Sequence, residues 1–275
     1  MKTILLLCCL LWASPAWCLD SLAIGTGIES SATYRLTKQL SPLWQTHSKN
    51  TNLTLGASPQ PSYRRAKAEL LAGRLDLAFL PLNMTHGRSL RILAVVWDIY
   101  LIPFRLDDDS SPFQWGGTSV FLDQTDGVFD SGTFAPELVG LPSSEFRQQV
   151  TNGEPGNYLK ETVASFTGLQ SFLGHKIYPA ELDSTFAHKL KANLPWLQNR
   201  KFRLGQQYQT VGYTLVLAAR EDLDLELGHS LYEFLCRPPK TIWGSSQWTR
   251  SLLADTTEKQ SPALLHPAIF YQKPK

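Results

Sequence analysis

The chain has 275 residues, with 26 Lys and Arg against 24 Asp and Glu, and four cysteines. A charge so close to neutral argues against a nucleic-acid partner or an anionic membrane surface. Three of the cysteines lie in the first 18 residues, so removal of that segment would leave Cys236 alone and exclude an intrachain disulfide.

Residues 1–18 have the pattern of a secretory signal peptide. Lys2 supplies the positive charge, Ile4–Trp12 the apolar stretch, and Ala16-Trp17-Cys18 the recognition positions. We expect cleavage between Cys18 and Leu19 and a periplasmic mature protein of about 257 residues, long enough to bury roughly 70–75% of its unfolded surface. Lipidation of Cys18 stays the minor alternative, because Trp17 is bulky for a lipobox.

The mature chain is organised around Leu22–Tyr34. Leu22–Ile24 predicts a buried strand, Gly25 and Gly27 permit a sharp turn, and Ser31 suits a helix N-cap. The N–H groups and dipole of such a helix N-terminus suit a carboxylate or phosphate. An ordinary βα unit with a tight turn explains the glycines as well, and on the glycines alone it is the favoured interpretation.

The next part of the chain predicts alternating strands and helices, the pattern of an α/β protein. The expected elements are a strand at 52–55, a turn-rich loop at 56–62, a helix at 63–72 capped by Ser62 and ended by Gly73, and a buried strand at 75–80. Leu90–Phe104 could be two strands, the second crossing to another lobe. Residues 107–140 have the texture of a loop or crossover, and residues 107–168 cannot be placed. The run Asp107-Asp108-Asp109 indicates a solvated acidic turn.

Near the C-terminus the pattern becomes regular again. Val211–Ala219 predicts a strand, and the apolar stripe from Leu227 to Leu235 predicts a helix that Pro238-Pro239 would stop.

Several of these segments resemble the TAXI family of TRAP-transporter solute-binding proteins. Gly25-Thr26-Gly27 and Ala32-Thr33-Tyr34 match the family's glycine loop, and Leu71–Ala78 matches a segment of the pattern Leu-x-x-Gly-x-x-Asp-x-Ala. The chain departs from the family at Ile28–Ser31, where the family is rich in glycine, and at Pro81-Leu82-Asn83, where it tends to Gln-Ser-Asp.

Later segments carry the same resemblance. Tyr178–Leu194 is similar to the family's helix before the hinge, Gly205 and Tyr208 to its Gly-Thr-Tyr, and Leu265–Tyr271 to its C-terminal Leu-His-Pro-Gly-Ala. The matching parts cover about two-thirds of the mature chain.

The resemblance implies a type II periplasmic-binding-protein fold, α/β and two-lobed, with a mainly parallel sheet and flanking helices in each lobe. Lobe one would comprise 19–102 and 211–275, and lobe two 103–210. It further implies a monomer that captures a small solute, an organic acid or amino acid, in the interlobe cleft and delivers it to the permease subunits of a TRAP transporter.

Ligands of this fold bind at the carboxyl ends of strands, which selects the candidate site. The residues expected to bind a carboxylate are Thr26, Gly27, Ser30, Ser31, Thr33, Tyr34, Ser58, Gln60 and Asn83, with Tyr208 from lobe two by resemblance. Glu29 would repel such a ligand unless it points to solvent.

Nothing in the sequence calls for a cofactor or a metal. The six histidines are scattered, and no nucleophile motif is present. Asp76 is interpreted as a structural hydrogen-bond partner, His266 as a capped or packed histidine, Cys236 as buried, and Trp44 and Trp196 as core residues. Two alternatives stay open: a sensory or accessory binding protein with a diverged or empty cleft, and a secreted hydrolase.

Overall fold

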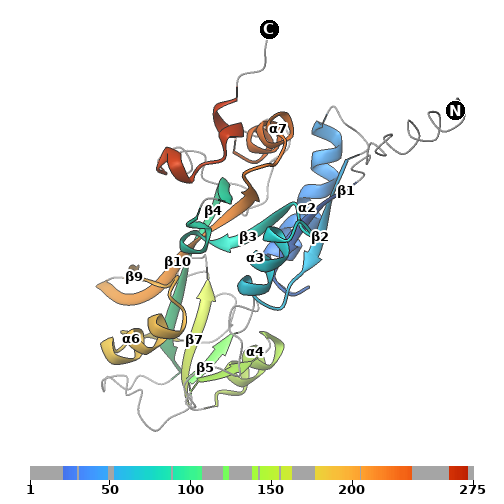
Figure 1. Ribbon diagram of the computed structural model, residues 1–275. Coiled ribbons are helices and arrows are strands. Elements are labelled where there is room, and N and C mark those ends of the chain that lie inside the picture. The colour runs from blue at the N-terminus through green and yellow to red at the C-terminus, as the bar shows by residue number, and fades with distance from the viewer. Residues whose placement is uncertain are drawn as a thin grey trace, which may run out of the picture.

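The computed structural model describes residues 21–29, 31–48, 53–87, 89–106, 120–123, 138–141, 143–154, 156–162, 177–204, 206–236 and 260–271 (Figure 1). The expected signal peptide with its cleavage site, the acidic run at 107–109, Ser30, Gly205 and Pro238-Pro239 lie outside the described residues.

The described elements alternate between strands and helices in the first part of the chain and again toward its end. They are β1 (Ser21–Thr26), α2 (Ala32–His47), β2 (Thr54–Pro59), α3 (Tyr63–Leu71), β3 (Leu77–Pro81), η1 (Leu82–Thr85), β4 (Leu90–Arg105), β5 (Val120–Asp123), β6 (Leu138–Leu141), α4 (Ser143–Asn152), β7 (Asn157–Thr162), β8 (Tyr178–Pro179), α6 (Ser184–Asn193), β9 (Gln198–Leu204), β10 (Gln206–Arg220), α7 (Leu225–Cys236), η3 (Pro262–Leu264) and η4 (Pro267–Phe270).

The strands form one continuous sheet that serves two lobes, in the order β2-β1-β3-β10-β4-β7-β5-β6. In lobe one, β1 pairs in parallel with β2 and β3, and β10 is antiparallel to β3 and β4. In lobe two, β5 pairs in parallel with β6 and β7. The structure therefore confirms a two-lobed α/β fold. Its sheet is mixed, because β10 and β4 pair antiparallel with all their neighbours, and the expectation of mainly parallel sheets holds only for β1 to β3 and for β5 to β7.

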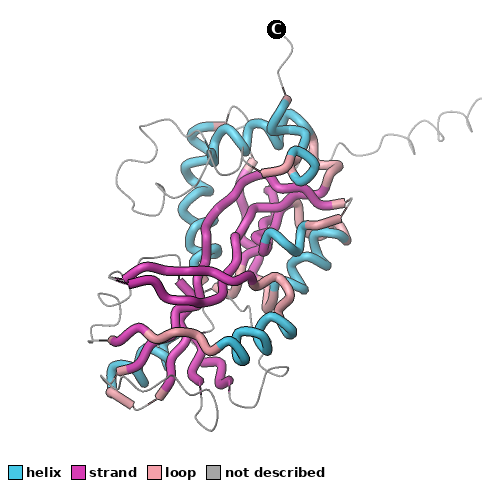
Figure 2. The backbone as a smooth tube through the Cα atoms, turned by 90° about the vertical axis from the view of Figure 1, so that its left-hand side faces the viewer, coloured by secondary structure: helices cyan, strands magenta, loops and turns pink. Residues whose placement is uncertain are grey.

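Two long strands, β4 and β10, join the lobes and run from the upper to the lower part of the molecule in Figure 1. The lobe boundaries expected at 102 and 210 fall inside these strands, where Leu101 pairs with Val211. The two predicted crossings thus lie side by side. Figure 2 shows the strands of the upper lobe between helices on either side.

The expectation of two strands within Leu90–Phe104 was wrong. The segment is one strand of 16 residues whose pairing with β10 shifts register between Leu215 and Val216 and again between Leu217 and Ala218. Asp98 does not end the strand, because its carboxylate accepts a hydrogen bond from the Thr214 hydroxyl on the neighbouring strand, at 2.6 Å. A paired carboxylate can stay inside a sheet.

Local signals placed the first helices well. Ser31 and Ser62 cap α2 and α3, accepting from the N–H groups of Tyr34 and Arg65, and Gly73 follows α3 with φ +72°. The expected loop at 56–62 was too long, because β2 continues to Pro59 as an outer strand paired with β1. The expected helix over Tyr178–Leu194 is shorter, and Asp183 caps its start at Ser184.

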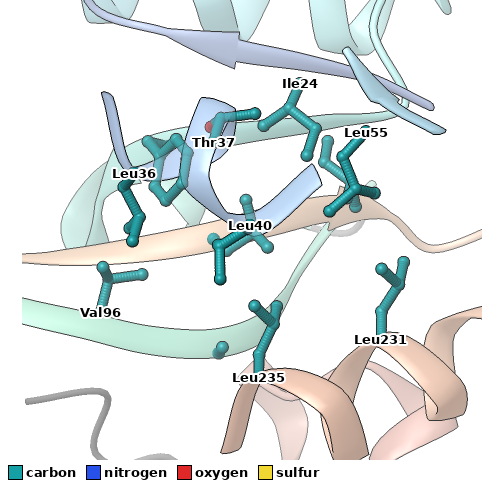
Figure 3. Close-up of a pocket in the computed structure, with 12 residues that line it drawn as sticks. Ile24, Leu36, Thr37, Leu40, Leu55, Val96, Leu231 and Leu235 are labelled. Carbon is teal, nitrogen blue, oxygen red and sulfur yellow. The ribbon is translucent and has the colours of Figure 1, made fainter. Parts of the chain in front are cut away.

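The core of lobe one lies between the sheet and the helices α2 and α7. Trp44 of α2 meets Phe234 of α7 edge to face, with ring centroids 5.2 Å apart. Figure 3 shows a small pocket in this core, with about 10 Å³ of free volume, lined by apolar side chains and Thr37. The Thr37 hydroxyl donates to the Thr33 carbonyl oxygen at 3.0 Å, so the pocket has the character of a packing void.

Candidate functional site

The turn between β1 and α2 differs from the sequence expectation at Gly25. This glycine lies within β1, and the described glycines with positive φ are Gly73, Gly87 and Gly153. A Cβ at Gly25 would lie 2.6 Å from Leu75 Cδ1 and 3.2 Å from the Ala78 Cβ. Glycine is needed here because other parts of the chain approach the strand closely, and it does not form the turn.

Three N–H groups of the turn have partners within the turn itself. The Gly27 N–H donates to the Thr33 hydroxyl at 2.9 Å, the Ser31 N–H to the Ile28 carbonyl oxygen at 2.8 Å, and the Tyr34 N–H to the Ser31 hydroxyl at 3.1 Å. Ser31 and Thr33 are fully buried, and their hydroxyl oxygens lie 3.1 Å apart. An anion at this helix N-terminus would have to compete with these hydroxyls.

Gln60, directly after β2, connects this strand to the β1–α2 turn. Its N–H donates to the Thr26 carbonyl oxygen at 3.1 Å, and its side-chain amide donates to the Ser58 hydroxyl at 3.1 Å. Ser58 belongs to β2 itself, and Gln60 follows it. The structure thus brings together seven of the predicted site residues: Thr26, Gly27, Ser31, Thr33, Tyr34, Ser58 and Gln60. Glu29 beside them is exposed.

Asn83 lies in η1, directly after β3, and contacts the chain just before and at the start of β9. Its side-chain oxygen accepts from the Gln198 amide at 3.2 Å, and its Nδ2 donates to the Trp196 carbonyl oxygen at 3.5 Å. The Arg64 guanidinium lies over the Trp196 ring, 5.9 Å from its centroid. Sequence reasoning selected Asn83 but not its partner Gln198, 115 residues away. It considered Arg64 as a possible contact for an anion and preferred a solvated helix face; its contact with Trp196 could not be read from the sequence.

Tyr208 lies apart from these groups, on the β9–β10 ribbon. It pairs with Phe202 across the ribbon, and the two rings stack with centroids 5.1 Å apart. The stacking gives Tyr208 a structural role in the ribbon, whatever else it contacts.

A buried hydrogen-bond chain crosses the junction of the lobes. The Tyr63 and Tyr213 hydroxyls lie 2.9 Å apart, and the Tyr213 hydroxyl donates to the Glu161 carboxylate. All three residues are buried. Tyr63 begins α3 in lobe one, and Glu161 is close to the carboxyl end of β7 in lobe two. No sequence motif predicts these hydrogen bonds. The one sign of them in the sequence is a pair of charged residues, Lys160 and Glu161, within a strand.

Lys160 is the second buried charge of this strand, with 7% of its surface exposed. Burial lowers the pKa of Lys160 to about 8; the nearby Glu161 carboxylate opposes the shift and the Arg35 guanidinium adds to it. The Lys160 ammonium lies 5.8 Å from the centroid of the Phe146 ring on α4. Arg35 lies in the first turn of α2 in lobe one. Its positive charge therefore affects the pKa of a lysine in lobe two.

The structural interpretations of single residues are confirmed. Asp76 accepts from the Ala23 N–H at 2.7 Å. The His266 ring accepts from the Ala268 N–H at 3.1 Å, and its other nitrogen lies 3.2 Å from the Arg220 carbonyl oxygen. Cys236, Trp44 and Trp196 are buried in the apolar core.

Two features are absent from the described ranges. No group of three or more His, Cys, Asp or Glu side chains there could hold a metal ion. No helix among those residues is long and apolar enough to span a bilayer.

No protein-family model matches the chain, and no curated protein matches it in sequence. Among solved structures, the chain is similar to a Xanthomonas citri protein bound to chloride ion, at 12% identity and a TM-score of 0.47, over 86% of this chain and 95% of that one. It is also similar to the periplasmic VFT2 domain of Bordetella pertussis BvgS, at 14% identity and a TM-score of 0.45, over 85% and 94%.

A third similar structure is the zinc-bound ligand-binding component of an ABC-type import system from Staphylococcus aureus. It has 12% identity and a TM-score of 0.45, over 91% of this chain and 84% of that one. All three TM-scores lie below 0.5, so the description of the fold rests on the strand order and pairing given above.

Proposed function

We propose that this protein binds a small solute between its two lobes. The observation that carries the proposal is the pair of buried charges, Lys160 and Glu161, close to the carboxyl end of β7, with Glu161 hydrogen-bonded through Tyr213 to Tyr63 of the other lobe. Burying charge is costly, and such groups concentrate at binding sites. The polar residues that the sequence predicts for solute binding lie at the carboxyl ends of β1, β2 and β3.

The solute, in this proposal, carries a carboxylate. Lys160, Arg35 and Arg64 supply positive charge near the junction, and Glu161 supplies one negative charge that a second, cationic group of the solute could meet. The resemblance to the TAXI family extends the proposal to export into the periplasm and delivery to a TRAP-type permease. No enzymatic step is part of it.

A sensory or accessory protein without a transported solute is the second candidate. The observation in its favour is the β1–α2 turn, where the Thr33 and Ser31 hydroxyls already accept hydrogen bonds from the Gly27 and Tyr34 N–H groups. In that case the glycine-loop site of the family has become a closed structural turn.

A thermal-shift screen of small carboxylic acids, amino acids and neutral sugars tests the proposal. A ligand present at 100 times its dissociation constant stabilises a protein by about 2.7 kcal/mol. We expect at least one acid to raise the melting temperature in a saturable way, and calorimetric titration to give a one-to-one complex. Failure of every acid would favour the accessory protein, and hydrolysis of ester or peptide substrates would favour an enzyme.

A further inference from the structure

The indole N–H of Trp196 is a buried donor without a hydrogen-bond partner among the described residues. Trp196 has 4% of its surface exposed, and its Nε1 is fully shielded. Tryptophan can only donate at this atom, and native proteins satisfy the large majority of buried polar groups. Such a donor calls for an acceptor that the described residues do not supply.

The surroundings of Trp196 indicate what that acceptor is. The Arg64 guanidinium lies over the indole ring. The Asn83 Nδ2 donates to the Trp196 carbonyl oxygen, and the Asn83 Oδ1 accepts a hydrogen bond from the Gln198 side-chain amide. Arg64 is in the first turn of α3, and Asn83 directly follows β3. Charged and neutral N–H donors therefore gather beside the strand ends at which ligands of this fold bind.

Trp44 provides a contrast within the same chain. Its Nε1 also has no partner among the described residues, but Trp44 packs against Phe234 in the apolar core between α2 and α7. No positively charged side chain lies over the Trp44 ring in the described part of the chain. An unsatisfied indole alone is thus not a site; the combination with Arg64 and Asn83 distinguishes Trp196.

We propose that Trp196 and Arg64 form a subsite for the carboxylate of the bound solute. The indole N–H donates one hydrogen bond to a carboxylate oxygen, and the guanidinium supplies the charge and the paired donors that suit this planar anion. The inference rests on the proposed solute binding and moves the anion from the β1–α2 turn to the start of α3 and the chain before β9.

The test follows the indole signals of the ¹⁵N-labelled protein by NMR. Trp196→Phe, which keeps the aromatic ring, assigns the Trp196 signal by its loss. Sodium acetate, sodium succinate and sodium glutamate are the probes, and sodium chloride at equal ionic strength is the control. We expect one of the acids to shift the Trp196 signal saturably, with the Trp44 signal unmoved.

Variants then measure the contribution of each group to the affinity for that acid. Trp196→Phe and Arg64→Gln should each weaken binding about tenfold or more, and the matched control Trp44→Phe should leave it unchanged. Arg64 is exposed, so its substitution tests the subsite without disturbing the core.

The outcomes separate the subsite from the proposed function. An acid that raises the melting temperature but leaves the Trp196 signal in place, or that binds both variants with unchanged affinity, overturns the subsite and keeps solute binding. A shift that sodium chloride reproduces also overturns the subsite. If no acid either stabilises the protein or shifts the signal, both the subsite and the carboxylate-binding function are wrong.

Discussion

Tyr213 donates a hydrogen bond to the Glu161 carboxylate across the strand that lies between them. Tyr213 belongs to β10 and Glu161 to β7, and both strands flank β4. The Tyr63 hydroxyl meets Tyr213 from the start of α3. A buried carboxylate is thereby held at the level where the chain passes from one lobe to the other.

Tyr213→Phe should destabilise the protein by about 2–3 kcal/mol, because it removes a donor from a buried carboxylate. Tyr63→Phe removes the outer member of the chain and should cost only about 1 kcal/mol. Urea unfolding of both variants measures the difference. Equal losses, or no loss in Tyr213→Phe, would show that the hydroxyl does not support Glu161.

Gly25→Ala should destabilise lobe one by about 1–3 kcal/mol, because the new methyl group would overlap Leu75 Cδ1. Gly56→Ala is the matched control in the neighbouring strand, where the nearest atom is the Ser21 hydroxyl on an exposed side chain. We expect a smaller loss there, measured by thermal and urea unfolding. A Gly25→Ala protein as stable as wild type would contradict the close approach.

Lys160→Met should stabilise the protein at pH 7, since it removes a buried ammonium group. Burial lowers the pKa of Lys160 from 10.5 to about 8, so between these values the unfolded chain binds more protons than the native chain. Stability should therefore rise with pH across this window, by about 3 kcal/mol. The stability difference between the two proteins, measured from pH 7 to pH 10.5, should shrink as pH rises; a constant difference would contradict the assignment.

His266 should make the protein less stable in mild acid. Burial lowers the pKa of His266 below its usual 6.5, and the neutral ring caps η4 by accepting from the Ala268 N–H. The unfolded chain then binds a proton below about pH 6.5 that the native chain does not, so stability falls as pH drops through that value. Urea unfolding between pH 7.5 and pH 5 should show a smaller fall in His266→Gln. Equal falls in the two proteins would count against this role.

The sequence predicted the parts of the fold that local chemistry decides. Ser31, Ser62 and Gly73 mark helix ends because caps and positive φ act within a few residues. The polar residues predicted at the ends of β1 and β2 lie together because parallel strands bring their carboxyl ends to one edge, and their role in binding stays a prediction.

What the sequence could not predict depends on long-range pairing. The length of β4 depends on its pairing with β10, which lies more than 100 residues away. The sequence alone does not show whether Asp98 ends the strand or, as here, pairs with Thr214 and stays within it. The Tyr63–Tyr213–Glu161 chain and the Arg64–Trp196 contact join residues of distant segments that no motif connects.

Ser31→Ala separates the two roles that the β1–α2 turn could have. The Ser31 hydroxyl caps α2 through the Tyr34 N–H and contacts the Thr33 hydroxyl, so its loss should cost about 1 kcal/mol of stability. Ser62→Ala, which removes the cap of α3, is the matched control and should cost a similar amount.

If the turn is purely structural, both variants bind the acid found in the screen as tightly as wild type. If Ser31 also holds the carboxylate, calorimetry should show affinity reduced by one to two powers of ten in Ser31→Ala alone, since a hydrogen bond to a charged group contributes about 1.5–3 kcal/mol. That result would place the carboxylate at the turn and count against the subsite at Trp196.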